Sequence, residues 1–216
     1  PYDPIKNFQP ITMIGSMPNI LVVRADSPYK SVQDVIAAAK AKPNAVNYAS
    51  SGNGTSQHLS GVFFEQKSGS KMVHVPYKSS AESLNALLSG QGADIIFENL
   101  APALPHIKAG KLRALGVTSD KRSPALPEVP AIAEALPGFS VESWQAIFAP
   151  AGVPKPVVDK LADAMIKAVN DPDIKSKLVA QGITPGGMTP AELAAFQKAE
   201  VEKWAQVVGA ANIKLD

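Results

Sequence analysis

The chain has 216 residues, of which 45% are hydrophobic, 21 are basic and 19 are acidic, which gives a formal net charge of +2. The length fits one large α/β domain or two small ones. The hydrophobic fraction excludes a disordered tail, and the absence of cysteine excludes disulfide scaffolds, iron–sulfur clusters and thiol catalysis. Because the two signs of charge are interleaved, we expect neither a nucleic-acid footprint nor a polybasic membrane patch.

The first half of the chain alternates between strands and helices. An aliphatic run at 20–23 indicates a short buried strand. A helix follows from Ser31, a candidate N-cap with Asp34 three residues on. Further strands are predicted at 46–49, 73–75, 94–97 and 112–117, with helical patterns between them. This alternation indicates a largely parallel sheet.

The second half has a different pattern. Residues 123–137 contain four prolines and are predicted to be irregular, and 139–148 could form a long strand. Three helices follow with few strands between them, and the last begins at Thr189 with a capping box completed by Glu192. Helices with one apolar face need something to cover, so this part is expected to pack on another segment of the protein.

The strongest chemical signal is the turn Ser51-Gly52-Asn53-Gly54-Thr55-Ser56, which follows a strand and opens a helix. Free backbone N–H groups and the positive end of the helix converge there, so a carboxylate or a phosphate would fit. The turn is not a dinucleotide fingerprint, because Gln57 stands at the third glycine, and no Gly-Lys-Ser/Thr follows to make a P-loop. A tight turn with a Ser/Thr N-cap explains the same residues equally well.

Two further polar loops are predicted at the same edge of the sheet. One is 77–80, with Ser79 and Glu82 as a possible capping box, and the other begins at Asn99. Ligands of open parallel sheets bind outside the carboxyl ends of the strands, so the three loops together would make a site for a small polar ligand. Taken singly, each loop is better explained by ordinary capping.

The three histidines, His58, His74 and His106, match no zinc spacing. His58 lies on the first turn after the glycine-rich loop and could orient it, although a structural histidine is the simpler interpretation. No G-x-S-x-G motif is present and no carboxylate pair stands out as an acid–base couple. We therefore expect no metal, no cofactor and no catalytic residue.

Six sequence strings, taken in order, resemble one family. They are Ser31-Val32 with the following helix, YASSGNGTSQHL at 48–59, HVPYK at 74–78, PHIKAGKLRALGVT at 105–118, RSPALPEVP at 122–130 and WQAIFAPAGVP at 144–154. Their order and spacing resemble the substrate-binding receptors of tripartite tricarboxylate transporters, the Bug family, over essentially the whole chain.

The resemblance implies a periplasmic receptor and not an enzyme. Its fold would be α/β, like the type II periplasmic-binding proteins, with two α/β domains that are joined by two crossovers and close on a ligand. Domain two would be 18–140, and domain one would be 1–17 with 141–216. Domain one would be incomplete, since family members have a longer N-terminal part that forms the other half of the carboxylate site.

The resemblance also implies site residues. One ligand carboxylate would be held by backbone and hydroxyl donors of Ser51, Gly52, Asn53, Gly54, Thr55 and Ser56. His58 would support the start of the helix, and Asn99 and Ala101 would face the cleft.

The implied partners are a small organic carboxylate and the membrane subunits of a tripartite transporter, with a monomeric receptor and no nucleic acid. Di- and tricarboxylates, aromatic acids and amino acids all remain open as ligands. Two alternatives also stay open. One is an α/β enzyme acting on an anionic substrate at the glycine-rich loop, and the other is a truncated receptor without tight binding.

Overall fold

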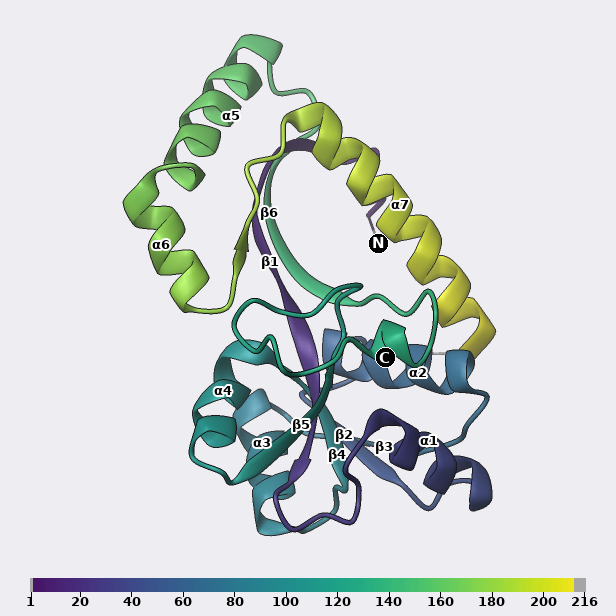
Figure 1. Ribbon diagram of the computed structural model, residues 1–216. Helices are drawn as coiled ribbons and strands as arrows, with labels where there is room; N and C mark the ends of the chain where they lie inside the picture. Colours follow the sequence, from purple (N-terminus) through teal and green to yellow (C-terminus); the bar gives the residue numbers. More distant parts are fainter. Residues whose placement is uncertain (1, 212–216) are drawn as a thin grey trace. The chain divides into compact units, whose positions relative to one another are not determined.

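The computed structural model describes residues 2–211 (Figure 1). Contacts within the chain divide it into two compact units. The central unit is Pro18–Ser143, and the terminal unit combines the described residues up to Met17 with those from Trp144 onward. Strand β1 (Phe8–Arg24) contributes its first part to the terminal unit and its last part to the central unit.

The aliphatic run at 20–23 is the end of a strand of 17 residues, much longer than the sequence predicts. Pro10 and Pro18 lie inside this strand, and proline argues against a strand when only the sequence is read. The four side chains from Ile20 to Val23 are fully buried, so other elements cover both faces of β1 in the central unit.

The sheet of the central unit has the strand order β3-β2-β4-β1-β5. Its other strands are β2 (Asn47–Ser50), β3 (Val73–Pro76), β4 (Ile95–Asn99) and β5 (Leu112–Val117). Strand β2 is parallel to β3 and β4, which confirms the prediction for these strands. The prediction is wrong for β1, which is antiparallel to β4 and β5. Helix α4 (Leu100–Lys108) joins β4 to β5, and β1 lies between these two strands in the opposite direction.

Four helices belong to the central unit. They are α1 (Val32–Ala41), α2 (Ser56–Ser68), α3 (Ser80–Ser89) and α4 (Leu100–Lys108). The capping box of Ser31 and Asp34 is confirmed at α1. At α3 the Ser79 hydroxyl accepts from the N–H of Glu82, but the Glu82 carboxylate accepts from the N–H of Lys78 instead of completing the box.

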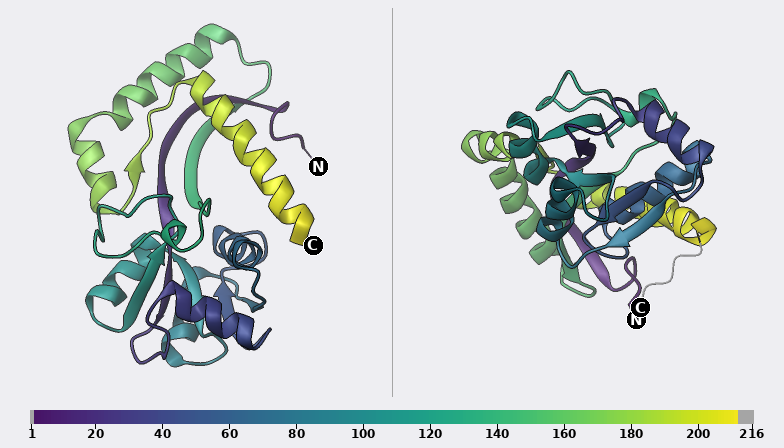
Figure 2. Two further views of the ribbon diagram at one scale, coloured as in Figure 1. Left: turned by 45° about the vertical axis from the view of Figure 1, so that its right-hand side comes forward. Right: turned by 90° about the horizontal axis from the view of Figure 1, so that it is seen from below.

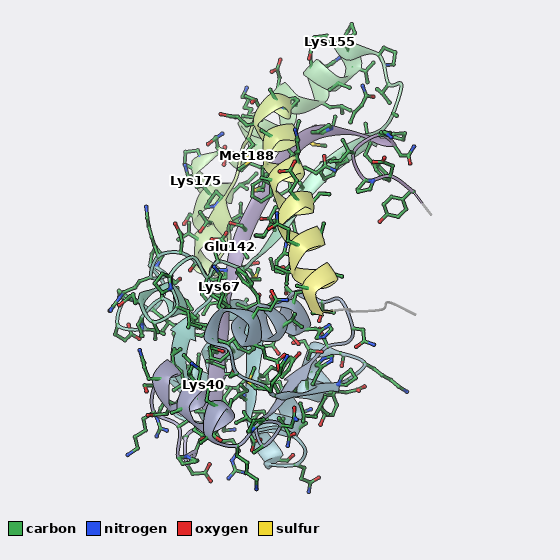
Figure 3. The ribbon with its side chains drawn as sticks, turned by 90° about the vertical axis from the view of Figure 1, so that its right-hand side faces the viewer. Lys40, Lys67, Glu142, Lys155, Lys175 and Met188 are labelled. Atoms are coloured by element: carbon green, nitrogen blue, oxygen red, sulfur yellow. The ribbon has the colours of Figure 1, made fainter. Side chains whose placement is uncertain are left out.

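Cations lie near the carboxyl ends of two of these helices. Lys40 is in the last turn of α1 and Lys67 is in the last turn of α2 (Figure 3). Each lies where the helix dipole is negative, which favours a positive side chain by a few tenths of a kcal/mol, up to about 1 kcal/mol.

The core of the central unit has two faces, because successive residues of a strand point to opposite sides of the sheet. On one face, Ile20 and Ile96 pack with Leu87 of α3 and Leu100 of α4. On the other face, aromatic rings meet one another edge-on or tilted: those of Tyr48, Phe64, Phe97 and Phe139. Figure 1 shows α3 and α4 on one side of the sheet and α1 and α2 on the other.

The proline-containing segment 123–137 is irregular as predicted, apart from one short 3-10 helix at Ile132–Glu134. The Ile132 side chain is fully buried, and Arg122 pairs with Glu134 at 2.8 Å on the surface. The segment therefore covers part of the core and is held by one buried anchor and one exposed ion pair.

The terminal unit holds the three predicted helices and more strand than the sequence predicts. Its elements are β6 (Glu142–Pro150), which begins in the central unit, α5 (Lys155–Val169), α6 (Pro172–Ala180), β7 (Thr184–Pro185) and α7 (Pro190–Ala211). Figure 2 shows α5 leading into α6 and β7 returning from it. Both β6 and β7 pair with β1, so strands distant in sequence build a sheet under these helices. No described helix is long and apolar enough to cross a membrane.

Trp144 is a packing residue of the terminal unit. Its indole N–H donates to Glu200 Oε2 at 3.2 Å, and its ring meets Phe196 edge-on with the centroids 5.5 Å apart. Trp204 donates to the same carboxylate oxygen at 3.0 Å. These contacts tie β6 to α7.

We predict that Gly61→Ala destabilises the protein even though alanine is the better helix former. A Cβ at Gly61 in α2 would lie 2.3 Å from Cε2 of the buried Tyr48 ring. Such overpacking typically costs about 1–3 kcal/mol, which outweighs a helix-propensity gain of about 1 kcal/mol. Urea unfolding of the variant measures the loss.

The matched control is Gly209→Ala in α7, where nothing lies within 4 Å of the added Cβ. This variant should be neutral or up to about 1 kcal/mol more stable. If both variants raise the free energy of unfolding, Gly61 does not pack closely against the Tyr48 ring.

Candidate functional site

Three loops of the central unit meet at one edge of the sheet. They follow β2, β3 and β4, which are neighbours in the order β3-β2-β4 and run parallel. Strand β1 runs the other way, so its residue Asn19 lies opposite Asn99 at the carboxyl end of β4. The three polar loops that the sequence places at one edge therefore do adjoin in the structure.

The glycine-rich loop depends on backbone conformations that favour glycine. Gly52 has a φ of 128° and Gly54 a φ of 75°. The Thr55 hydroxyl donates to the Gly52 carbonyl at 2.8 Å and accepts from the N–H of His58 as the N-cap of α2. The Ser50 hydroxyl accepts from the N–H of Gly52 at 3.1 Å. The loop is thus held tightly by its own side chains.

Most backbone donors of this loop are already used inside the chain. The N–H of Ser51 donates to Gln57 Oε1 at 2.6 Å, and that of Gly54 donates to His58 Nδ1 at 3.1 Å. The N–H groups of Ser56 and Gln57, on the first turn of α2, have no partner among residues 2–211. The donors open to a ligand therefore lie toward the helix start.

The six loop residues differ in exposure. Asn53 is exposed, whereas Ser51, Gly52, Gly54, Thr55 and Ser56 are half-buried. The hydroxyl of Ser56 lies 3.2 Å from Asn19 Nδ2, which also donates to the Phe97 carbonyl at 2.9 Å. This amide bridges β1, β4 and the start of α2.

The start of α4 lacks the side-chain cap that α1, α2 and α3 have. Asn99 is its N-cap residue but makes no capping hydrogen bond, and Asn99 Oδ1 is buried without a partner in the described chain. The N–H groups of Leu100 and Ala101 have no capping side chain, and Pro102 has no N–H. The half-buried residues Asn99 and Ala101 thus mark a second helix start with unused donors.

His58 belongs to an aromatic stack beside the loop. Its ring lies 3.9 Å from that of His74, which lies 4.9 Å from that of Tyr48. Because His58 Nδ1 accepts from Gly54, its other ring nitrogen carries the proton of the neutral form. His74 Nε2 contacts the Ser50 hydroxyl at 2.6 Å. The structure places His58 as a support of the loop, whereas His106 lies in the last turn of α4.

The stack is neutral at pH 7. Burial lowers the pKa of His58, and burial together with the neighbouring His58 lowers the pKa of His74 to about 4. If either ring were protonated, the resulting imidazolium would be poorly hydrated and would lie directly against the neighbouring ring. The loop therefore rests on two uncharged rings.

The sequence analysis did not single out the buried polar residues under the loops. They are Asn19, Ser50, Gln57, Glu98 and Thr118, each at most 1% exposed. Ser50 and Glu98 lie at the carboxyl ends of β2 and β4, Thr118 directly follows β5, and Gln57 is on the first turn of α2. Asn19 lies inside β1, opposite Asn99. A polar residue that ends an otherwise aliphatic strand, such as Glu98, is the signal that could have revealed them.

A hollow of about 270 Å³ lies at the opposite edge of the sheet. Its lining includes Arg24, Asp26, Tyr29 and Asp94, and Arg24 is already paired with Asp26. No helix begins at this hollow, so it lacks the backbone donors found at the carboxyl edge. We therefore place the candidate site at the three loops.

The site lacks the parts of a hydrolase. The ring of His58 is bonded to a backbone N–H and to no hydroxyl. The one Ser–His contact seen among the described residues joins Ser50 to His74, but Ser50 is fully buried and its oxygen also meets two backbone groups of Gly52. Within residues 2–211, no three His, Asp or Glu side chains converge to hold a metal ion. The arrangement is suited to binding an anion.

A family model described as tripartite tricarboxylate transporter family receptor matches residues 1–213. The chain is 38% identical over 210 residues to a Pseudomonas sp. (strain P51) protein named "UPF0065 protein in tcbD-tcbE intergenic region". That match covers 96% of this chain and 62% of the relative, so the chain spans less than two thirds of the relative's length.

Two solved structures are similar over nearly the whole chain. "R. palustris Rpa4515 with adipate" is 35% identical with a TM-score of 0.87, and the match covers 98% of this chain and 71% of that one. "MatC (Rpa3494) from Rhodopseudomonas palustris with bound malate" is 30% identical with a TM-score of 0.83, covering 96% and 71%. The chain therefore shares its fold with a protein solved with adipate and with a protein solved with malate.

We predict that Thr55→Ala costs about 1 kcal/mol of unfolding free energy, because it removes the N-cap of α2. Thr55→Ser keeps the hydroxyl and should recover most of that loss. Chemical denaturation of the two variants checks the cap. Equal stabilities of the alanine and serine variants would contradict it.

The histidine stack predicts acid sensitivity. His74 has a lowered pKa in the folded chain, so its neutral form contributes stability that is present above pH 6.5 and is lost as the pH falls toward 4. After a discount for partial exposure, the loss between pH 7 and pH 5 is on the order of 1 kcal/mol. It is measured as the difference in urea midpoint between wild type and His74→Phe at each pH.

The control for this measurement is His106→Gln, outside the stack. Its midpoint should run parallel to that of the wild type between pH 7 and pH 5. A difference between wild type and His74→Phe that stays constant with pH would show that His74 is not the acid-sensitive group.

Proposed function

Because this chain belongs to the tripartite tricarboxylate transporter family of receptors, we propose that it is a periplasmic receptor that captures a small organic carboxylate and delivers it to the membrane subunits of such a transporter. The observation that carries the proposal is the pair of neighbouring helix starts at one sheet edge. The N–H groups of Ser56 and Gln57 on α2, and of Ala101 on α4, have no partner in the described chain. Two such helix starts favour an anion.

The proposed binding residues are those that the sequence identified, with roles that follow from the geometry. Ser56 and Ala101 supply donors to the carboxylate, together with the hydroxyl of Ser51 and the N–H of Asn53. Gly52, Gly54 and Thr55 shape the loop through the bonds described above, and His58 holds it through Gly54. Asn99 lies beside the Ala101 donor at the start of α4.

The site would recognise its ligand with uncharged donors. Hydrogen bonds to a carboxylate are charge-assisted and roughly twice as strong as neutral ones, so a few backbone N–H groups suffice to orient the ligand. The neutral His58–His74 stack adds no fixed charge. A receptor must release its ligand as well as bind it. A site that forms no ion pair with the ligand carboxylate suits both steps.

We propose a small dicarboxylate as the ligand class. The two similar structures are named with adipate and with malate, and both molecules are dicarboxylic acids. Tricarboxylates, aromatic acids and amino acids carry the same anchoring group and belong in the comparison set. We also propose the division of the chain into a domain of residues 18–140 and a domain of 1–17 with 141–216.

The direct test is a thermal-shift and calorimetric titration of this chain with adipate, malate, citrate, benzoate and glutamate. A ligand at 100 times its Kd adds roughly 2.7 kcal/mol to the free energy of unfolding. We expect at least one dicarboxylate to bind. If none of the five acids shifts unfolding, the chain alone is not a tight carboxylate receptor.

We further predict that Ala101→Asp weakens carboxylate binding at least tenfold without loss of stability. The helix dipole stabilises a negative side chain in the first turn of α4, but this side chain repels an anionic ligand. Ala101→Asn is the control of equal size and should bind more tightly than Ala101→Asp. Equal affinities of these two variants would place the ligand away from the start of α4.

A further inference from the structure

Glu98 links the two helix starts through a chain of hydrogen bonds. Its Oε1 accepts from Gln57 Nε2 at 2.5 Å and from the N–H of Asn99 at 2.8 Å. The same Gln57 accepts the N–H of Ser51 through its Oε1 at 2.6 Å. One carboxyl group thus connects the glycine-rich loop after β2 to the start of α4.

The other oxygen of Glu98 has no partner. Oε2 is buried without a hydrogen bond in the described chain, and so is Asn99 Oδ1 on the next residue. Both are acceptors when Glu98 is ionised, and the Glu98 side chain is fully buried. A buried charged oxygen without a donor is costly, whereas a proton on Oε2 removes the charge and with it most of that cost.

The bonds on Oε1 agree with the acid form. In a protonated carboxyl group the carbonyl oxygen accepts hydrogen bonds and the other oxygen carries the proton, and here the hydrogen bonds from Gln57 and from the N–H of Asn99 meet the same oxygen, Oε1. Burial raises the pKa of Glu98, while contacts with the N–H of Asn99 and with Ser80 and Gln57 oppose that rise.

No charge in the described chain compensates an ionised Glu98. Titratable side chains on the elements packed against β4 are Arg24, Tyr48, His58, Glu65, Lys67, Glu82, His106 and Lys108. None of them is a hydrogen-bond partner of Glu98 and none contributes to the shift of its pKa. None of these charged side chains therefore replaces the hydration that a carboxylate loses on burial.

We propose that Glu98 is a positioning residue that works in its protonated form: it locks the glycine-rich loop to the start of α4 and leaves the site without a negative charge of its own. This inference rests on the proposed carboxylate-binding function. Ionised, the same group would repel the ligand and leave a buried charge unpaired. Protonated, it holds Ser51 and Asn99 in a fixed relation, so the free donors of α2 and α4 meet the ligand as one preformed set.

The protonation state is tested without ligand. Glu98→Gln has the shape of the acid, keeps an acceptor and a donor, and cannot ionise. The infrared difference spectrum of wild type minus Glu98→Gln at pH 7 should show the carbonyl band of a protonated carboxylic acid, shifted in D₂O. A difference spectrum that contains only carboxylate bands overturns the proposal. Glu128→Gln, an exposed glutamate of the same unit, supplies the carboxylate reference.

The positioning role is tested by binding of adipate and malate. Glu98→Gln should keep the wild-type Kd within about threefold, and Glu98→Leu, which loses both bonds on Oε1, should weaken binding at least tenfold. If Glu98→Leu does not fold, Gln57→Met breaks the same chain from the other end and should show the same loss. Glu128→Gln should bind like wild type.

Each outcome separates this inference from the function on which it rests. If wild type binds neither acid, the proposed function fails. If wild type binds but Glu98→Gln is tenfold weaker, binding requires the ionised carboxylate and the inference is wrong. If wild type binds and a folded Glu98→Leu or Gln57→Met variant binds with the same Kd, the link between the two helix starts is not needed for binding.

Discussion

The central position of β1 is the constraint on which the rest of the structure depends. This strand is buried on both faces between β4 and β5 and runs antiparallel to both. The reversed direction brings Asn19 to the carboxyl edge, where it bonds to Phe97 and Ser56. Its N–H also donates to the Thr118 hydroxyl at 2.7 Å. One strand therefore holds the ends of β4 and β5 and the start of α2 together.

Below the loops, the edge contains buried polar groups that have to be paired. A buried polar group without a partner costs about 1–3 kcal/mol, and most polar side-chain atoms beneath the loops are paired with one another, Glu98 Oε2 and Asn99 Oδ1 excepted. This pairing uses up the donors of Ser51 and Gly54 and leaves those of Ser56, Gln57 and Ala101. The proposed binding surface is the part of the backbone that the internal network does not use.

The absence of a fixed charge follows from the same burial. His58 and His74 stay neutral because they stack away from water, and Glu98 is buried where no cation of residues 2–211 contributes to the shift of its pKa. A site of this kind attracts an anion through oriented dipoles alone. That arrangement suits a receptor, which has to bind and release its ligand.

The sequence by itself determined the local features. Capping at Ser31, Thr189 and Ser79, the glycine-rich turn and the order of helices all depend on residues within a few positions of one another. Only the tertiary structure decided the direction of β1, the histidine stack and the chain from Ser51 through Gln57 to Glu98. These join residues tens of positions apart, through contacts that exist only once the sheet has formed, and a polar residue that ends a strand does not show in the sequence which group it will meet.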